Sequence, residues 1–178
     1  MKKTLIALAS VASLLCANGA ANAAGTIQGT LGVTITIGAG CVVTGGNSAG
    51  VSNDFGSISF GTYSSLANVI AATATGSGGT GSLGLNCTNG TNYTVALDNG
   101  LYASGSQRRM ASSVPAYISY NLYQDIAHAL PWNSTSGVLT GVGTGSAVPL
   151  IVYGLVPAAG TTPAAGAYSD TVTMTVTW

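Results

Sequence analysis

The sequence predicts an all-β protein, built as a β-sandwich or barrel. Apolar and polar side chains alternate with a period of two through most of the chain, and no segment sustains the helical period of 3.6. Turn-forming Gly, Asn, Asp and Pro residues separate the alternating runs, as in proteins made of many short strands. Only 4% of the 178 residues are charged and no charged run occurs, which excludes a basic nucleic-acid-binding surface.

The first 23 residues are typical of a signal peptide. Lys2 and Lys3 make the start positive, an apolar run covers residues 4–15, and Ala21-Asn22-Ala23 is a small-residue cleavage site. No stop-transfer pattern follows, so a cleaved leader is favoured over an uncleaved anchor. Cleavage after Ala23 would leave two arginines and four aspartates, a net charge of −2.

Export also decides how we interpret the cysteines. Cys16 lies in the leader, so Cys41 and Cys87 remain as a pair in an oxidising compartment, where only one intramolecular bridge is possible. A metal site would need further ligands, and none has suitable spacing. We therefore expect a Cys41–Cys87 disulfide.

The predicted strands follow in chain order. The first covers residues 26–37, and further alternating runs cover residues 83–87, 93–97, 118–122 and 148–152. The last covers residues 168–178, with Thr at every second position from 171 to 177. Residues 64–72 could form a short helical turn or, equally, a strand.

The first and last predicted strands suggest an incomplete sheet. An immunoglobulin-like sandwich ending on residues 168–178 would leave that strand without a partner, and an exposed edge is an aggregation hazard. Residues 26–37 could fill the gap in their own sheet. They could instead fill the gap of a neighbouring molecule, a contact that does not close and therefore builds a filament. The alternating pattern does not choose between the two.

Several distinct short motifs lie along the chain after the leader. They are Gly40-Cys41, Phe55-Gly56, Phe60-Gly61, Cys87 at a strand end, the block Tyr120-Asn121-Leu122-Tyr123-Gln124-Asp125, and the strand of residues 168–178. In combination they resemble the spore coat protein U domain family, specifically the pilin subunits of archaic (Csu-type) chaperone–usher pili. The resemblance covers essentially all of the chain after the leader.

The resemblance implies an incomplete immunoglobulin-like β-sandwich that lacks its last strand and is completed by donor-strand complementation. Residues 1–23 would be the signal peptide, 24–38 the N-terminal donor strand segment and 39–178 the pilin domain. Cys41 and Cys87 match the disulfide of the family. The implied donor side chains and positions are Ile27, Gly29, Leu31, Val33, Ile35 and Ile37. The implied residues of the acceptor groove and terminal strand are Val172, Met174, Val176 and Trp178.

The implied function is that of a structural subunit that polymerises by donor-strand exchange into surface fibres for adhesion and biofilm formation. Its partners would be neighbouring copies, other pilus subunits, a periplasmic chaperone and an outer-membrane usher. The chain would pass through the periplasm to the cell surface. One domain with a donor segment implies a shaft subunit rather than a tip adhesin.

Other functions have weaker support in the sequence. His128 follows Asp125 by three residues, but the Gly-x-Ser-x-Gly nucleophile motif is absent, so we expect neither an enzyme nor a cofactor or metal site. Arg108-Arg109 is the only basic pair after the leader, and we expect it in a solvated loop. The alternative is a secreted, self-complemented β-sandwich that binds carbohydrate through aromatic side chains, although strand spacing is more typical of core residues. The candidates are Tyr102, Tyr117, Tyr120, Tyr123 and Trp132.

Overall fold

The computed structural model describes residues 25–45, 54–76, 83–114 and 116–178, and all regular elements in these ranges are β-strands. The all-β prediction is confirmed. The predicted signal peptide lies outside the described residues. The chain divides into two units, Met1–Thr36 and Ile37–Trp178. Among the residues that the structure describes, no helix is long and apolar enough to cross a bilayer.

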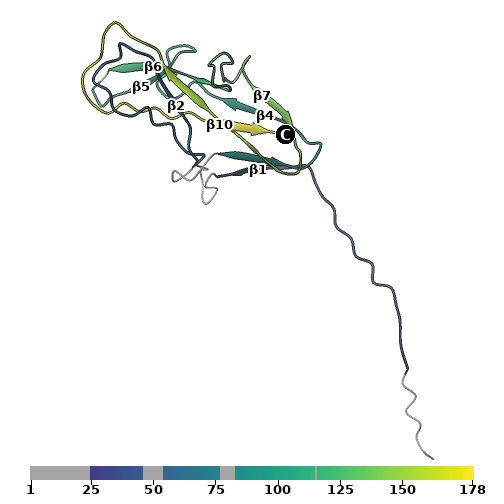
Figure 1. Ribbon diagram of the computed structural model, residues 1–178. Helices are drawn as coiled ribbons and strands as arrows, with labels where there is room; N and C mark the ends of the chain where they lie inside the picture. The colour runs from purple at the N-terminus through teal and green to yellow at the C-terminus, as the bar shows by residue number, and fades with distance from the viewer. Residues whose placement is uncertain (1–24, 46–53, 77–82, 115) are drawn as a thin grey trace, which may run out of the picture. The chain divides into compact units, whose positions relative to one another are not determined.

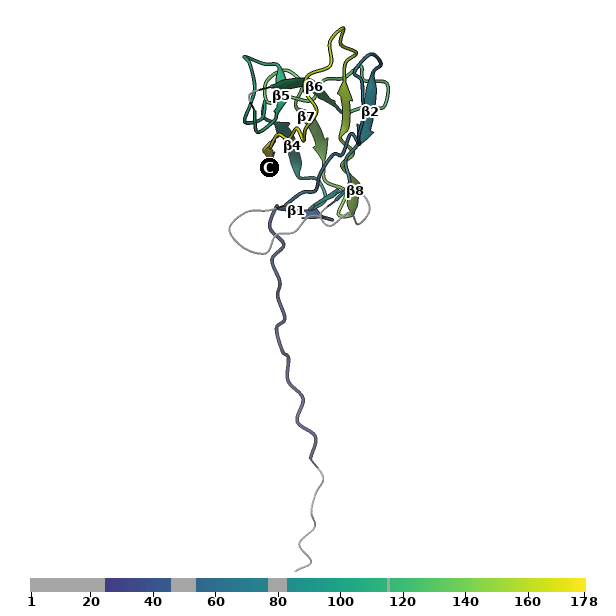
Figure 2. The same ribbon diagram turned by 90° about the vertical axis from the view of Figure 1, so that its left-hand side faces the viewer.

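The strands of the second unit pair into three antiparallel sheets (Figure 1, Figure 2). The first sheet has the order β1 (Cys41–Thr44), β3 (Gly84–Cys87), β8 (Ala147–Pro149). The second has the order β10 (Met174–Thr177), β4 (Asn92–Leu97), β7 (Leu139–Val142). The third has the order β2 (Ile70–Thr73), β9 (Tyr153–Val156), β6 (Tyr117–Tyr123), β5 (Arg108–Ala111).

One hydrophobic core receives side chains from all three sheets. The strands bury alternate positions because successive side chains point to opposite faces, as β4 does with Val95 and Leu97. Among the described residues, Trp132 is the largest fully buried side chain, 1% exposed. Its backbone N–H donates to the Leu122 carbonyl on β6 at 2.8 Å, and its indole Nε1 donates to the Val95 carbonyl on β4 at 2.8 Å. Trp132 therefore links the second sheet to the third.

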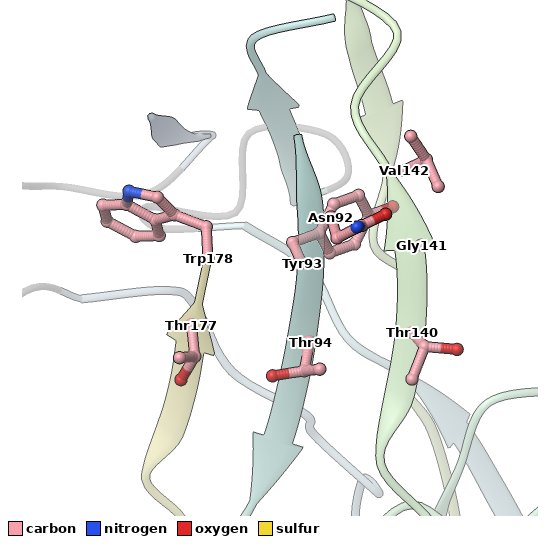
Figure 3. A pocket seen from close by; sticks show the side chains of 8 residues that line it. All are labelled: Asn92, Tyr93, Thr94, Thr140, Gly141, Val142, Thr177 and Trp178. Carbon is pink, nitrogen blue, oxygen red and sulfur yellow. The ribbon is translucent and has the colours of Figure 1, made fainter. Parts of the chain in front are cut away.

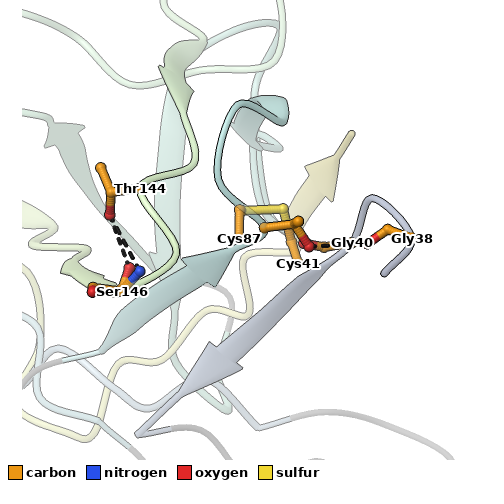
Figure 4. The surroundings of a disulfide bond; sticks show 7 residues. Gly38, Gly40, Cys41, Cys87, Thr144 and Ser146 are labelled. Carbon is orange, nitrogen blue, oxygen red and sulfur yellow. Dashed lines mark hydrogen bonds between the residues drawn. A yellow bond between two sulfur atoms is a disulfide. The ribbon is translucent and has the colours of Figure 1, made fainter. Parts of the chain in front are cut away.

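The predicted disulfide is present. Cys41 and Cys87 face each other in the β1–β3 register, and their sulfur atoms are bonded (Figure 4). Next to it, the Thr88 N–H donates to the Gly40 carbonyl at 2.9 Å, and the Thr88 hydroxyl donates to the Gly38 carbonyl at 3.1 Å. The start of the second unit is therefore attached to the end of β3 by one covalent bond and by hydrogen bonds.

The strand boundaries differ from the sequence predictions in several places. Residues 25–40 form no strand within this chain, and the terminal strand is confined to Met174–Thr177. Residues 148–152 do not form one strand, because β8 ends at Pro149 and β9 begins at Tyr153. The ambiguous stretch 64–72 is not helical, and its end joins β2.

The expectation of a solvated loop at Arg108-Arg109 is wrong. Both residues lie on β5, and Arg108 is 5% exposed. Local composition suggested a loop, but pairing with β6 places alternate β5 side chains inward, and carbonyl oxygens at the end of β4 accept hydrogen bonds from the buried guanidinium.

Candidate acceptor groove

A groove of about 760 Å³ lies in the second unit. One wall is residues 54–60 and the other is residues 168–174, which lead into β10. Both walls present several side chains to the cavity. The floor between them is mainly apolar and is formed by Ala74, Leu83, Leu97, Met110, Tyr120, Leu122 and Val152.

The floor of this groove is also the hydrophobic core. Leu83, Leu97, Leu122 and Val152 belong to the buried cluster, although they line the cavity. Removing water from such a surface is favourable by about 25 cal/mol for each Å² of apolar area covered. An apolar segment that entered the groove would therefore pack directly against side chains of the core.

The strand into which the second wall leads, β10, has an open backbone edge. The Asp98 N–H donates to the Thr173 carbonyl at 3.0 Å, one position before the β4–β10 ladder begins, so Thr173 and Asp98 face each other at a hydrogen-bonding position. Bonding alternates along an antiparallel ladder, so the N–H and C=O groups of Met174 and Val176 point away from β4. No described strand pairs with β10 on that side. The edge can accept one further strand.

The opposite wall is held at its middle by a short backbone pair. The Ser57 N–H donates to the Thr75 carbonyl and the Thr75 N–H donates to the Ser57 carbonyl, both at 2.9 Å. Gly56 adopts a φ of +103°, and a Cβ at this position would collide with the Thr75 carbonyl oxygen. The Asp54 carboxylate accepts the Gly56 N–H at 2.9 Å. This wall presents Phe55, Ile58 and Phe60 to the groove.

Two carboxylates help to attach residues 168–173, in addition to the backbone bonds at Ser169 and Thr173. Asp170 accepts the Tyr120 hydroxyl at 2.7 Å and the Leu101 N–H at 2.9 Å. Asp98 accepts the Thr173 N–H through its side chain at 2.9 Å. Burial acts to raise the pKa of Asp98, but backbone hydrogen bonds, first from Thr173 and then from Gly100, hold that pKa below its ordinary value.

Arg108 lies beneath these carboxylates. Its Nε donates to the Asp98 carbonyl at 2.8 Å and its Nη2 donates to the Leu97 carbonyl at 3.1 Å. Asp98 can offer its carbonyl because its carboxylate replaces that oxygen as the acceptor for Thr173. Burial lowers the pKa of Arg108, and burial raises the pKa of Tyr120, as does its hydrogen bond to Asp170.

Comparison with known proteins identifies the family. Residues 27–175 match the Spore Coat Protein U domain. The chain belongs to this family. Protein U of Myxococcus xanthus is 38% identical over 184 aligned residues, which cover 99% of this chain and 98% of that protein.

A solved structure also matches the chain. It is the CsuC–CsuE chaperone–tip adhesion subunit pre-assembly complex from archaic chaperone-usher Csu pili of Acinetobacter baumannii, with a TM-score of 0.47 and 22% identity. The match covers 80% of this chain and 40% of that chain, so this chain spans less than half of its length.

The predicted groove residues of this Spore Coat Protein U domain occupy three environments. Val172 and Met174 line the groove. Val176 is half-buried and packs against the core. Trp178 is 58% exposed and lines a second cavity of about 480 Å³, together with Tyr93 and others (Figure 3). In that cavity Thr177, Thr94 and Thr140 lie in register across β10, β4 and β7.

The predicted donor residues carry large exposed apolar side chains. Ile27 is 99% exposed, and Ile37, the least exposed, is 71% exposed. Leu31, Val33 and Ile35 are exposed to a similar degree, and Gly29 has open space where a Cβ would lie. These residues alternate with Gln, Thr and Gly, so an extended conformation would place them on one face.

The aromatic residues considered for carbohydrate binding do not share one environment, because Tyr102 and Tyr117 are exposed. Tyr120 and Trp132 are buried in the core. The Asp125 carboxylate accepts the backbone N–H groups of Leu130 and Ala129, and the first of these bonds is the main reason that its pKa is lowered. The His128 and Tyr123 rings pack edge to face, with 5.1 Å between their centroids. Within the described ranges, no group of three or more His, Cys, Asp or Glu side chains could hold a metal ion.

Two parts of the site were missed at the level of sequence. The wall of residues 54–60 was noted only for its Phe-Gly motifs, because it lacks strict alternation. The roles of Asp98 and Arg108 depend on pairing between distant strands. A usable signal was the scarcity of charge, since a charged residue that persists in such a chain is a candidate for a buried structural contact.

Proposed function

We propose that this chain is a structural subunit of an archaic chaperone–usher pilus and polymerises by donor-strand exchange. The observation that carries the proposal is the groove with an apolar floor and an unpaired β10 edge. The same chain has an exposed apolar segment, residues 27–37, with the spacing of a strand. Membership in the Spore Coat Protein U domain family supports it.

The segment and the groove are chemically complementary. A strand added at β10 would pair with the backbone groups of Met174 and Val176, which supplies affinity, while alternate side chains would enter the groove and supply specificity. Ile27, Leu31, Val33, Ile35 and Ile37 would each contribute about 1.5–3 kcal/mol on full burial. Ordering the segment opposes part of this gain. The joint should therefore dissociate very slowly.

The donor in this proposal comes from a neighbouring copy. Such a contact is heterologous and does not close, so successive copies form a filament. A periplasmic chaperone covers the groove until exchange, and an outer-membrane usher carries out assembly at the cell surface. The chain acts as a shaft subunit, and the fibres serve adhesion and biofilm formation.

The donor assignment is tested by placing a charge on each face of the segment. Leu31→Asp and Val33→Asp introduce carboxylates on the apolar face. They should abolish filaments seen by electron microscopy while leaving a soluble chaperone complex. The matched controls Thr30→Asp and Thr34→Asp add the same charge on the polar face, and they should still polymerise. Normal filaments from the Leu31 and Val33 variants would overturn the donor assignment.

A second measurement separates exchange between copies from filling of the chain's own groove. Chains with the Leu31→Asp and Val33→Asp changes retain an intact groove and should bind a labelled peptide of residues 25–38 at a ratio of one to one. If a chain fills its own groove, wild type purified alone will be a stable monomer that takes up no peptide. The carbohydrate alternative loses two of its five candidate residues, because Tyr120 and Trp132 are core residues, while Tyr102 and Tyr117 stay exposed.

A further inference from the structure

Charged groups gather at one wall of the groove. The described residues include six charged side chains: Asp54, Asp98, Arg108, Arg109, Asp125 and Asp170. Three of the six belong to this wall or contact it: Arg108 donates to the Asp98 carbonyl, the Asp98 carboxylate accepts the Thr173 N–H, and Asp170 accepts the Tyr120 hydroxyl. We call Asp98, Arg108, Tyr120 and Asp170 the wall clasp. So many polar contacts at one place in a charge-poor chain call for a physical role.

The wall that the clasp contacts has few other attachments. Regular pairing of β10 begins only at Met174. Within residues 168–172, all of which the structure describes, the backbone pairs with another segment at one bridge, between Ala111 and Ser169. Asp170 accepts the Leu101 and Thr171 N–H groups at 2.9 Å. The Ser169 bridge, the Asp98 N–H bond to the Thr173 carbonyl and the bonds of the Asp98 and Asp170 carboxylates therefore connect residues 168–173 to the strands around them.

The fit around Asp170 is close. Gly100 adopts a φ of +77°, and a Cβ there would collide with the Asp170 carboxylate. The Tyr120 ring lies in the groove floor, 6.3 Å from the Phe60 ring of the opposite wall, while its hydroxyl donates to Asp170 at 2.7 Å. Tyr120 thus connects the floor directly to the wall.

We propose that the wall clasp holds residues 168–173 in the conformation that an incoming strand requires before any strand, from a chaperone or from a neighbouring copy, has entered the groove, so that Tyr120 and Asp170 are positioning residues for strand binding. The inference rests on the proposed function. An empty groove has no partner strand to order its wall, and the clasp takes over that task. Once a strand is bound, its pairing along β10 orders the wall and the clasp becomes less important.

This division of roles has a kinetic signature. If loss of the clasp reduces the fraction of chains with an ordered wall, the apparent affinity falls by the same fraction. The loss should be in the association rate, because the bound state is held by the strand itself. A residue that merely stabilised the complex would instead change the dissociation rate.

The test uses the full chain with Leu31→Asp and Val33→Asp, which leaves its groove empty, and a labelled peptide of residues 25–38. Tyr120→Phe removes one hydroxyl and keeps the ring. The matched control is Tyr123→Phe on the same strand, where the hydroxyl makes no hydrogen bond within the described residues. Stopped-flow fluorescence gives the association and dissociation rates, and NMR gives amide exchange at Leu101, Thr171 and Thr173.

We expect Tyr120→Phe to slow peptide association about tenfold to a hundredfold, the factor that corresponds to a hydrogen bond with a charged group. Dissociation should change less than threefold. Amide exchange at Leu101 and Thr171 should accelerate by a similar tenfold or more in the empty chain, and return to the parent level when peptide is bound. Tyr123→Phe should leave all of these quantities unchanged.

Two results would overturn the proposal. One is unchanged association together with unchanged amide exchange in Tyr120→Phe. The other is a change confined to dissociation. Failure of the parent chain to bind the peptide at all would instead count against the proposed function, and amide exchange in the empty chain would still decide whether the clasp orders the wall.

Discussion

Arg108 and Arg109 are adjacent cations whose replacement should have very different effects on stability. Arg108→Met keeps a long flexible side chain and removes the buried guanidinium. The carbonyls of Leu97 and Asp98 then lose their donor. Leu97 lies beyond the last β4 residue that pairs with β7, and the N–H of Met174, its partner on β10, points away from β4, so neither strand replaces the lost hydrogen bond.

The magnitude follows from the number of acceptors. A buried acceptor left unsatisfied costs about 1–3 kcal/mol, and two are involved. Relief of the cost of burying a cation offsets part of this loss. We expect Arg108→Met to lower the free energy of unfolding by about 2–4 kcal/mol. Arg109 contacts the Tyr117 ring at 4.3 Å and is half-buried, so Arg109→Met should cost less than about 1 kcal/mol.

The assay is urea unfolding followed by tryptophan fluorescence, in chains whose Leu31→Asp and Val33→Asp changes prevent polymerisation. Trp132 is buried beside β4 and reports directly on the core. The reasoning would be refuted if the two arginine variants unfolded within about 0.5 kcal/mol of each other, since the structure assigns one to the interior and the other to the rim.

Three further changes follow from the same structure. The double change Cys41→Ser and Cys87→Ser opens a loop with a sequence separation of 46 and should cost about 4 kcal/mol in urea unfolding, the chain-entropy value; a loss below about 1 kcal/mol would contradict it. The depressed pKa of Asp98 contributes stability above the ordinary carboxyl value near 3.8 that is lost as pH falls through the lower folded value, so Asp98→Asn should flatten the stability curve below about pH 4. If Asp98→Asn lost stability at acid pH as steeply as the parent chain, protonation of a group other than Asp98 would be the cause. Gly100→Ala should cost at least about 1 kcal/mol, because of its positive φ and its collision with Asp170; thermal unfolding at the parent temperature would rule this out.

The sequence predicted the fold where the period of two was strong. Leu83 to Cys87 and Tyr93 to Leu97 alternate clearly, and both correspond to strands with buried alternate positions. β1 and β7 have four residues each and were not singled out, because four residues give too little periodic signal. Their positions depend on pairing with β3 and β4.

The groove was only half predictable for a similar reason. Val172 and Met174 could be placed on one face of a terminal strand by spacing alone. The opposing wall at Phe55 and the clasp at Arg108 depend on contacts between residues far apart in sequence, which no local pattern encodes. Arg108 and Arg109 look equivalent in sequence, and only the β5–β6 register separates them.

The disulfide also determines the covalent route by which tension passes through the domain. Between Gly40 and Thr88 that route runs through one sulfur–sulfur bond, and residues 42–86 lie off it. Thr88–Thr91 then lead directly into β4, which pairs with β10 at the edge of the groove. A force applied between residues 25–37 and a strand bound at β10 would thus act along this short covalent route. The covalent chain through β2 and the wall of residues 54–60 would carry none of that force.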